Sequence, residues 1–123
     1  MLEISAKNLG TATVLCLQGR IVIGDTETLR NVVQSLSEPS AVILDLARVT
    51  MVDAHGLGVM LELREQTLER GIRFELMNVS EPMSRVLEIT RLDSVFQITS
   101  GVEFFPQVSR DSRARLAALR SCA

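Results

Sequence analysis

Aromatic side chains are nearly absent from this chain, which limits how its core can be built. Trp and Tyr do not occur, and Phe occurs four times among the 123 residues. The hydrophobic fraction is nevertheless 46%. We therefore expect a single domain of ordinary size whose core is made of aliphatic side chains.

The chain also lacks an excess of basic residues. It has 13 Lys and Arg against 15 Asp and Glu, which gives a net charge of -2. Domains that bind nucleic acid normally carry a surplus of positive charge on one face. We therefore expect no nucleic-acid partner.

Long apolar runs are missing as well. No run approaches the roughly 18 to 20 residues that cross a bilayer. The first ten residues, MLEISAKNLG, have neither the basic start nor the apolar stretch of a secretion signal. We expect a cytoplasmic protein without membrane insertion.

Cysteine and histidine, the residues of nucleophilic and metal sites, are scarce. Cys16 and Cys122 lie far apart, in neither a disulfide framework nor a metal-binding spacing, so we expect reduced thiols. His55 is the only histidine, and no Ser or Cys is close to it in the sequence. We expect no enzyme activity, no catalytic residue and no cofactor.

A metal or phosphate site finds little support. Asp45, Asp53 and His55 would supply three metal ligands at most, and we expect no metal site. Gly56-Leu57-Gly58 opens a helix in the manner of a phosphate-binding turn, but it is too short for either nucleotide fingerprint. Close packing of the helix on the strands explains both glycines equally well.

Hydrophobic periodicity predicts an alternation of strands and helices. The expected elements are strands at 2–6 and 13–17, a helix from Asp25 to Leu36, a strand at 41–52, a helix from Ala54 to Arg70, a strand at 72–79, a short helix after Ser80, a strand at 95–98 and a helix at 109–119. The order predicts an α/β fold with a mixed sheet, made of an N-terminal hairpin followed by βαβ units. Right-handed crossovers then place the helices mainly on one face. A flavodoxin-like sheet would start with βαβ instead.

The stretch 41–61, AVILDLARVTMVDAHGLGVML, is the best candidate for a functional site. It reads as a buried strand, an acidic loop and the start of a helix, where free backbone N–H groups and a partial positive charge face outward. We expect any site to lie at Asp53 to Gly58.

This stretch resembles the core of STAS domains, the family of bacterial anti-sigma factor antagonists. The residues that match are Leu44-Asp45-Leu46, Val52-Asp53 and Gly56-Leu57-Gly58-Val59, with Val86, Ile89, Leu92 and Phe96 in the place of the family's VxxxLxxxGLxxxF segment. The resemblance also covers the hairpin that ends at Gly19, the first helix and the turn at Gly71. It implies a STAS domain over 1–105, with 106–123 as a C-terminal helical extension of the same domain.

The resemblance implies a switch that this chain has lost. In the family, the Ser or Thr after the loop Asp is phosphorylated by the anti-sigma factor, a serine kinase, and the unphosphorylated form binds that kinase. Ala54 occupies this position here and has no hydroxyl. His55 replaces the next small hydroxylated residue, and Val22 stands where many phosphorylated members carry Asp.

Three functions remain open after this comparison of motifs. The first is a protein that binds an anti-sigma factor, or a similar serine kinase-like partner, without phosphorylation at the loop. The second is a STAS docking subunit of another assembly, such as a phospholipid ABC transport complex or a stress-signalling particle. The third is a small enzyme or a phosphocarrier that uses His55. The oligomeric state stays open in all three.

The expected partner-binding surface combines the loop and its neighbouring rim. Its residues are Asp53, Ala54, His55, Gly56 and Leu57, with Arg20, Val22 and Asp25 as the rim. The C-terminal extension adds a second charged surface, with arginines at 110, 113, 115 and 120. That surface suits an acidic partner or a membrane surface, a solvated face, or a helix packed on the sheet edge.

Overall fold

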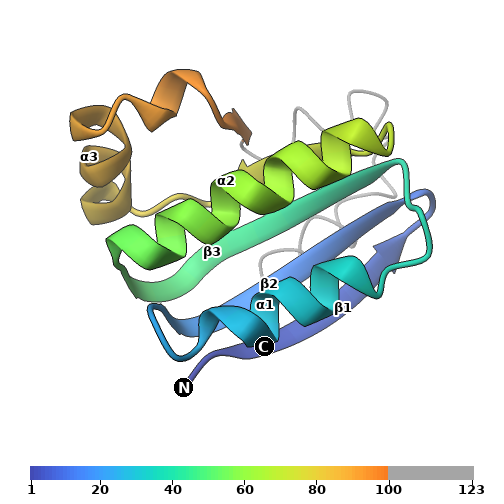
Figure 1. Ribbon diagram of the computed structural model, residues 1–123, viewed down its shortest axis with the longest axis horizontal. Helices are drawn as coiled ribbons and strands as arrows, with labels where there is room; N and C mark the ends of the chain where they lie inside the picture. The colour runs from blue at the N-terminus through green and yellow to red at the C-terminus, as the bar shows by residue number, and fades with distance from the viewer. Residues whose placement is uncertain (100–123) are drawn as a thin grey trace, which may run out of the picture.

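Five strands form one mixed sheet in the computed structural model, which describes residues 1–99 (Figure 1). The elements are β1 (Glu3–Leu9), β2 (Ala12–Ile21), α1 (Thr26–Gln34), β3 (Ala41–Val52), α2 (Ala54–Glu69), β4 (Arg73–Met77), α3 (Glu81–Ile89), the 3-10 helix η1 (Leu92–Ser94) and β5 (Gln97–Thr99). The expected helix at 109–119 and the expected boundary at 105–106 lie outside the described residues.

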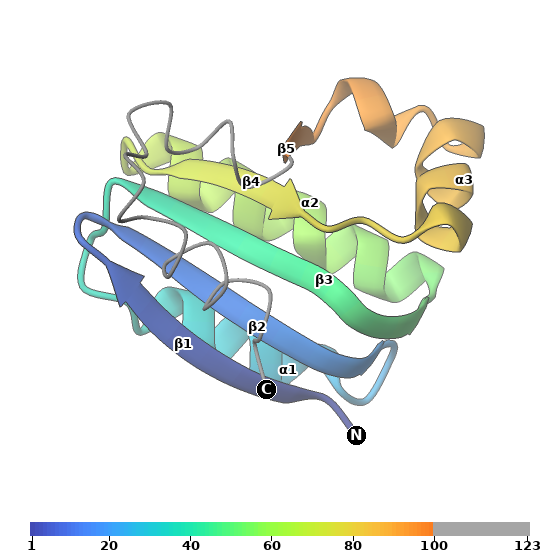
Figure 2. The same cartoon turned by 180° about the vertical axis from the view of Figure 1, so that it is seen from behind.

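The sheet has the predicted topology. Its order is β1-β2-β3-β4-β5; β1 pairs with β2 in antiparallel fashion, and each later pair is parallel. α1 and α2 lie side by side on one face of the sheet, as the two opposite views show (Figures 1 and 2). The predicted α/β fold, with an N-terminal hairpin followed by βαβ units, is confirmed.

The main core lies between the sheet and the helices and is aliphatic, as the composition requires. The sheet supplies alternate residues of β2 and β3, and α1, α2 and α3 supply Leu29, Met60 and Leu87, each 0% exposed. Phe74 and Phe96 are the aromatic members, with ring centroids 6.3 Å apart. Full burial of each aliphatic side chain contributes about 1.5–3 kcal/mol to the free energy of unfolding.

A smaller apolar cluster lies on the opposite face of the same strands. Its members are Ala12, Val14, Cys16, Ala41, Ile43 and Met77, all buried. The two apolar clusters lie on opposite faces of the same strands because successive side chains of a strand point to opposite faces. Both faces of the central strands are therefore buried.

The expectation of reduced thiols is wrong at Cys16. This residue is 4% exposed on β2, and it is disulfide-bonded. Spacing along the chain could not show this, because a disulfide depends on proximity in the folded molecule.

β2 is longer than predicted, and its extension continues the pairing with β3 to Ile21 and Val52. The pairing register shifts between Cys16 and Gln18, and again between Gly19 and Arg20. Gly19 has φ +114°, and a Cβ there would lie 2.2 Å from the carbonyl oxygen of Met1. This glycine lets the strand continue to Ile21, whose carbonyl accepts a hydrogen bond from the Asp53 amide at 3.3 Å.

Within residues 1–99, no helix combines the length and the apolar character needed to cross a bilayer. The longest helix, α2, has 16 residues and a polar side that carries Glu62, Glu65 and Glu69.

Candidate functional site

Two loops meet at the carboxyl ends of the neighbouring parallel strands β2 and β3. The first, residues 22–25, leads into α1; the second consists of Asp53, which leads directly into α2. In α/β sheets, functional groups collect outside the carboxyl ends of parallel strands. We refer to residues 22–25 together with 53–56 as the loop pair.

Asp53 holds the loop pair together. It is the N-cap of α2, where its Oδ1 accepts a hydrogen bond from the Gly56 amide at 2.7 Å. Its Oδ2 accepts a hydrogen bond from the Ile23 amide of the other loop at 2.9 Å. A single carboxylate therefore caps one helix and fixes the loop that precedes the other.

These contacts also set the charge state of Asp53. The backbone amide of Ile23 lowers the pKa of this carboxyl most, and the amide of Gly56 lowers it further. Partial burial raises the pKa and the nearby His55 lowers it, both with smaller effect. Hydrogen bonds to the ionised form favour that form, so Asp53 stays a carboxylate throughout the neutral range.

Gly56 allows α2 to lie directly against the end of β2. A Cβ at this position would lie 1.9 Å from the carbonyl oxygen of Ile21. Gly58 differs, because a Cβ there would meet nothing within 4 Å. Close packing therefore explains the first glycine of the Gly-Leu-Gly segment and not the second.

His55 forms a second contact across this region, between the starts of the two helices. Its Nε2 lies 3.0 Å from Oγ1 of Thr26, the first residue of α1. Thr26 is 2% exposed, whereas His55 is exposed. The imidazole therefore spans from the start of α2 to the start of α1 and keeps one edge in solvent.

Ala54 lies between these two tied residues and makes the exposed tip of the loop pair. It is the first residue of α2 and is exposed. Its methyl group is offered to solvent at the positive end of the helix. No hydroxyl is present at this position.

The other residues of the expected surface occupy different environments. Arg20 is exposed, and Val22 and Asp25 are half-buried, with the Asp25 carboxylate 3.7 Å from the N-terminal amine. Asp25 is the N-cap of α1 but makes no capping bond through its side chain. Leu57 is 8% exposed and packs in the main core, so its side chain is not presented at the surface.

The structure adds apolar residues that sequence reasoning did not select. Ile23 is 71% exposed and its amide donates to Asp53, and Met51, two residues before Asp53, is 54% exposed. A cavity of about 490 Å³ opens between the end of β3 and α3. Its lining includes Met51, Val52, Pro82 and Met83. Only the relative placement of β3 and α3 creates this cavity, so no local pattern could have revealed it.

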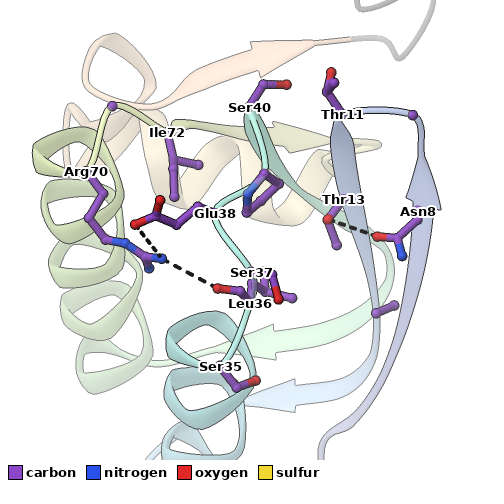
Figure 3. Close-up of a pocket in the computed structure, with 14 residues that line it drawn as sticks. Asn8, Thr11, Thr13, Ser35, Leu36, Ser37, Glu38, Ser40, Arg70 and Ile72 are labelled. Carbon is purple, nitrogen blue, oxygen red and sulfur yellow. Dashed lines mark hydrogen bonds and ion pairs between the residues drawn. The ribbon is translucent and has the colours of Figure 1, made fainter.

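A second hollow, of about 750 Å³, lies at the amino ends of the parallel strands, away from the loop pair (Figure 3). Hydroxyl groups and the Arg70 guanidinium line it. Arg70 is already engaged, because its Nη2 lies 3.9 Å from Glu38 and donates to the carbonyl of Leu36 at 3.5 Å. This hollow presents no uncompensated charge to a ligand.

Asp45 is the last residue of β3 that pairs with β4, and it has a structural role. Its Oδ1 accepts hydrogen bonds from the Ala47 amide at 3.0 Å and from Asn78 Nδ2 at 3.2 Å. Among residues 1–99, no cluster of three His, Cys, Asp or Glu side chains is arranged to hold a metal ion.

Comparison with known proteins gives a consistent result. The family model described as the STAS domain matches residues 3–110. A STAS-domain containing protein of Pseudomonas aeruginosa is 25% identical over 91 residues, which cover 73% of this chain and 90% of that protein.

Solved structures share the fold at lower identity. An anti-sigma factor antagonist from Mycobacterium paratuberculosis superposes with a TM-score of 0.73 and 19% identity, over 98% of this chain and 96% of that one. A sulfate transporter family protein from Wolinella succinogenes gives a TM-score of 0.67 and 23% identity, over 75% and 80% of the two chains.

Proposed function

The chain belongs to the STAS domain family, and from this premise we propose that it is a non-enzymatic protein-binding module of the anti-sigma factor antagonist type. In this proposal the loop pair binds an anti-sigma factor or a related serine kinase-like protein. Phosphorylation at the usual loop position does not control the binding, because Ala54 stands there.

One observation carries the proposal: the exposed Ala54 lies between two residues that both contact the segment after β2, Asp53 at the loop 22–25 and His55 at the first residue of α1. Asp53 bonds the Ile23 amide at 2.9 Å, and His55 lies 3.0 Å from Thr26. A surface that is ordered before it binds loses less conformational entropy on binding. The loop pair therefore suits recognition by a protein surface.

The chemistry of Ala54 determines how such binding is regulated. A phosphate on a hydroxyl would add almost two negative charges to the surface. Ala54 cannot receive one, so this surface keeps its binding-competent form. We infer that this protein binds its partner constitutively. The switchable members of the family instead alternate between a phosphorylated and an unphosphorylated state.

The apolar neighbours of the loop pair extend the surface available to a partner. Ile23, whose amide bonds Asp53, and Met51 are exposed large side chains, and Met51 also lines the cavity against α3. Apolar and Met side chains at the centre of an interface supply much of its affinity. The polar atoms of Asp53 and His55 then orient the partner on this surface.

Catalysis or phosphate transfer by His55 has less support. STAS domains of the antagonist type are generally non-catalytic. The Nε2 atom of His55 already faces the Thr26 hydroxyl at 3.0 Å. A phosphocarrier that used this nitrogen would have to give up the contact with Thr26.

The alternative is a docking subunit of a transport complex or a stress-signalling particle. The fold is also found in a sulfate transporter family protein, so the architecture alone serves more than one assembly. The two functions differ in the protein that is bound. The proposed binding surface, the loop pair, is the same in both.

The first experiment measures binding at the loop pair. The tagged chain is incubated with native lysate, the captured protein is identified by mass spectrometry, and its affinity is then titrated in purified form. We expect an anti-sigma serine kinase, with Ala54→Glu weakening binding about tenfold or more because it places a charge in the interface. Glu at the first position of a helix favours folding, so the effect does not arise from instability.

The control is Ala6→Glu, which makes the same change at an exposed position of β1. It should bind like the wild type. Equal affinity for the wild type and Ala54→Glu would exclude the loop pair. Capture of a transporter subunit instead would support the alternative function.

The second experiment tests the absence of the switch. The wild type and Ala54→Ser are incubated with ATP and the captured kinase, and residues 53–56 are examined by mass spectrometry. We expect no phosphate on the wild type and phosphoserine on Ala54→Ser, since the variant restores the family's acceptor. Phosphate on the wild-type loop, at His55 included, would contradict constitutive binding.

A further inference from the structure

β3 continues past the end of its neighbour β4. The pairing of β4 with β3 runs from Ala41 to Asp45, whereas β3 itself extends to Val52. Asn78, directly after β4, adopts φ +57°, and the chain leaves the sheet there and runs to α3 (Figure 2). Within the part of the chain that the structure describes, no strand pairs with residues 46–52 on this side. We call this segment the free edge.

The backbone of the free edge offers hydrogen-bonding groups to a further strand. In a sheet, the N–H and C=O groups of alternate residues point to alternate neighbours. On one side, residues 46–52 pair with β2 up to Val52, and the groups on the other side point away from β2. One amide of the segment is already used, because Ala47 donates to Asp45 Oδ1 at 3.0 Å. Strand edges of this kind are templates for the addition of another extended chain, and this one spans about 23 Å.

An apolar cavity lies along the free edge on the helix side of the sheet. It is the cavity of about 490 Å³ described above, and its volume is typical of binding sites. Its lining comprises residues 49–52 of β3 and Ser80, Pro82, Met83 and Val86 at and within α3. The Thr50 hydroxyl donates to the Gly19 carbonyl at 3.3 Å. The Ser80 hydroxyl accepts from the Met83 amide at 3.4 Å. Because both hydroxyls are engaged, the cavity suits apolar side chains.

The other face of the same edge is basic. Arg48 and Arg20 are exposed and lie opposite the helices, because they alternate with Val49 and Ile21 of the main core. Among the described residues, neither guanidinium has an ion-pair or hydrogen-bond partner. Glu3 lies in the same row as Arg48, but two strand spacings away, which corresponds to about 10 Å. The positive charge beside the free edge is therefore available to an acidic group.

We propose that the free edge binds an extended segment of a partner protein in which apolar and acidic residues alternate. The segment adds to β3 as a further strand and places its apolar side chains in the cavity beside α3. Its acidic side chains then lie on the other face, toward Arg48 and Arg20. The alternation follows from strand geometry, because successive side chains point to opposite faces. This inference goes beyond the binding proposed for the loop pair, and its test needs no partner of that surface.

Acidic side chains near the free edge do not oppose this assignment. Glu81, at the start of α3, lies 3.7 Å from Arg85 in an ion pair. The Asp53 carboxylate accepts hydrogen bonds from two backbone amides. Opposite charges on neighbouring strands stabilise their pairing, and like charges weaken it. Arg48 therefore favours an acidic segment over a basic one.

The first test measures the binding of synthetic peptides to the purified chain by fluorescence anisotropy. The probe is a labelled peptide of about seven residues in which Glu and Ile alternate. A second peptide replaces each Glu by Lys, and a third carries methyl groups on its two central amide nitrogens. We expect both to bind about tenfold more weakly than the probe, the second through repulsion by Arg48 and the third through lost hydrogen bonds. Equal binding of the methylated peptide would overturn strand addition.

Charge reversal at the edge tests the contact with Arg48. Arg48→Glu should weaken binding of the Glu peptide about tenfold and strengthen binding of the Lys peptide by a similar factor. Tight binding of the Lys peptide would also show that the variant is folded. Arg64→Glu, which makes the same change on α2, should bind both peptides like the wild type. Unchanged affinities in Arg48→Glu would overturn the charge recognition.

Hydrogen exchange shows where the peptide binds. The Glu peptide should slow amide exchange in residues 46–52 about tenfold or more, whereas amides of β1, at the border of the sheet, should keep their rates. Protection of β1 in place of the free edge would overturn the proposal. A doubled mass of the chain in sedimentation, lost when the peptide is added, would assign the edge to a second copy and overturn it as well.

Discussion

Asp53 shows how one side chain can organise a surface formed by two loops. Its two carboxylate oxygens bond amides from different loops, Ile23 at 2.9 Å and Gly56 at 2.7 Å. The sequence pattern points to Asp53 but not to its bond with Ile23, because that bond depends on the extension of β2. An acidic residue before a helix usually indicates only a cap.

Stability should depend on the ionisation of Asp53. The amides lower its pKa in the folded state, so the ionised carboxylate stabilises the fold above the pKa of the unfolded chain. This contribution is lost as the pH falls below about 4 and through the lower folded value. We expect Asp53→Asn to be less stable than the wild type at pH 7.

Urea unfolding at a series of pH values measures this effect. The difference in free energy of unfolding between the wild type and Asp53→Asn should narrow below about pH 4. A difference that stays constant from pH 7 to pH 3 would show that charge at Asp53 contributes nothing to stability.

The two glycines at the start of α2 should respond in opposite directions to alanine. In Gly56→Ala the new Cβ meets the Ile21 carbonyl at 1.9 Å, so the helix must move away from β2. We expect a loss of about 2–4 kcal/mol in the free energy of unfolding. In Gly58→Ala nothing lies within 4 Å, and we expect a gain of about 0.5–1 kcal/mol.

Chemical denaturation of the two variants is a matched comparison, since both make the same change within one turn of one helix. If Gly56→Ala were as stable as the wild type, the close approach of α2 to β2 would be refuted. Gly56→Ala should also weaken partner binding, because the loop pair would no longer hold its geometry.

At the scale of elements, the helix ends were predictable because their signals are local. Ser80 caps α3, with its Oγ accepting from the Met83 amide at 3.4 Å. Gly71 adopts φ +75° after α2, as the C-terminal glycine of a helix does. Each of these features depends on residues within one turn, so a sequence pattern contains the necessary information.

Two details of the elements could not be predicted in this way. The hydrophobic spacing along α2 predicts a buried Leu68, but this side chain is 45% exposed. Thr67 takes the buried position, where its hydroxyl donates to the carbonyl of Leu63 at 2.9 Å. A hydroxyl that is satisfied within its own helix can be buried at little cost, and the hydrophobic pattern misses such residues.

The strand β4 carries an acidic residue whose burial is unfavourable. Glu75 is 8% exposed, and desolvation raises its pKa although the nearby Arg73 lowers it. A raised folded pKa means that the ionised carboxylate destabilises the fold near neutral pH. Stability should then increase as the pH falls through the folded pKa toward the lower, unfolded value.

Glu75→Gln is the corresponding variant. It should unfold at a higher urea concentration than the wild type at pH 7, and the two proteins should converge below about pH 4, where Glu75 is protonated. Arg73→Gln is a useful control, because it should make the wild-type carboxylate more unfavourable at neutral pH. A Glu75→Gln variant that is less stable at pH 7 would contradict this account.

At the scale of the whole molecule, the fold class followed from the order of elements. A hairpin followed by alternating helices and strands permits few arrangements once crossovers are right-handed. The candidate site could be predicted only in part: the sequence pattern singles out the stretch 53–56, but not its contacts with Ile23 and Thr26. Those contacts join residues about 30 positions apart, and only the folded sheet brings them together.

The sheet order has a consequence for how the protein is made. The five strands stand side by side in the order in which the ribosome releases them. Each emerging strand can therefore pair with the one already in place, and no strand waits for a later one to be inserted between its neighbours. Such local pairing favours rapid folding and limits the time during which unpaired strand edges are exposed to other nascent chains.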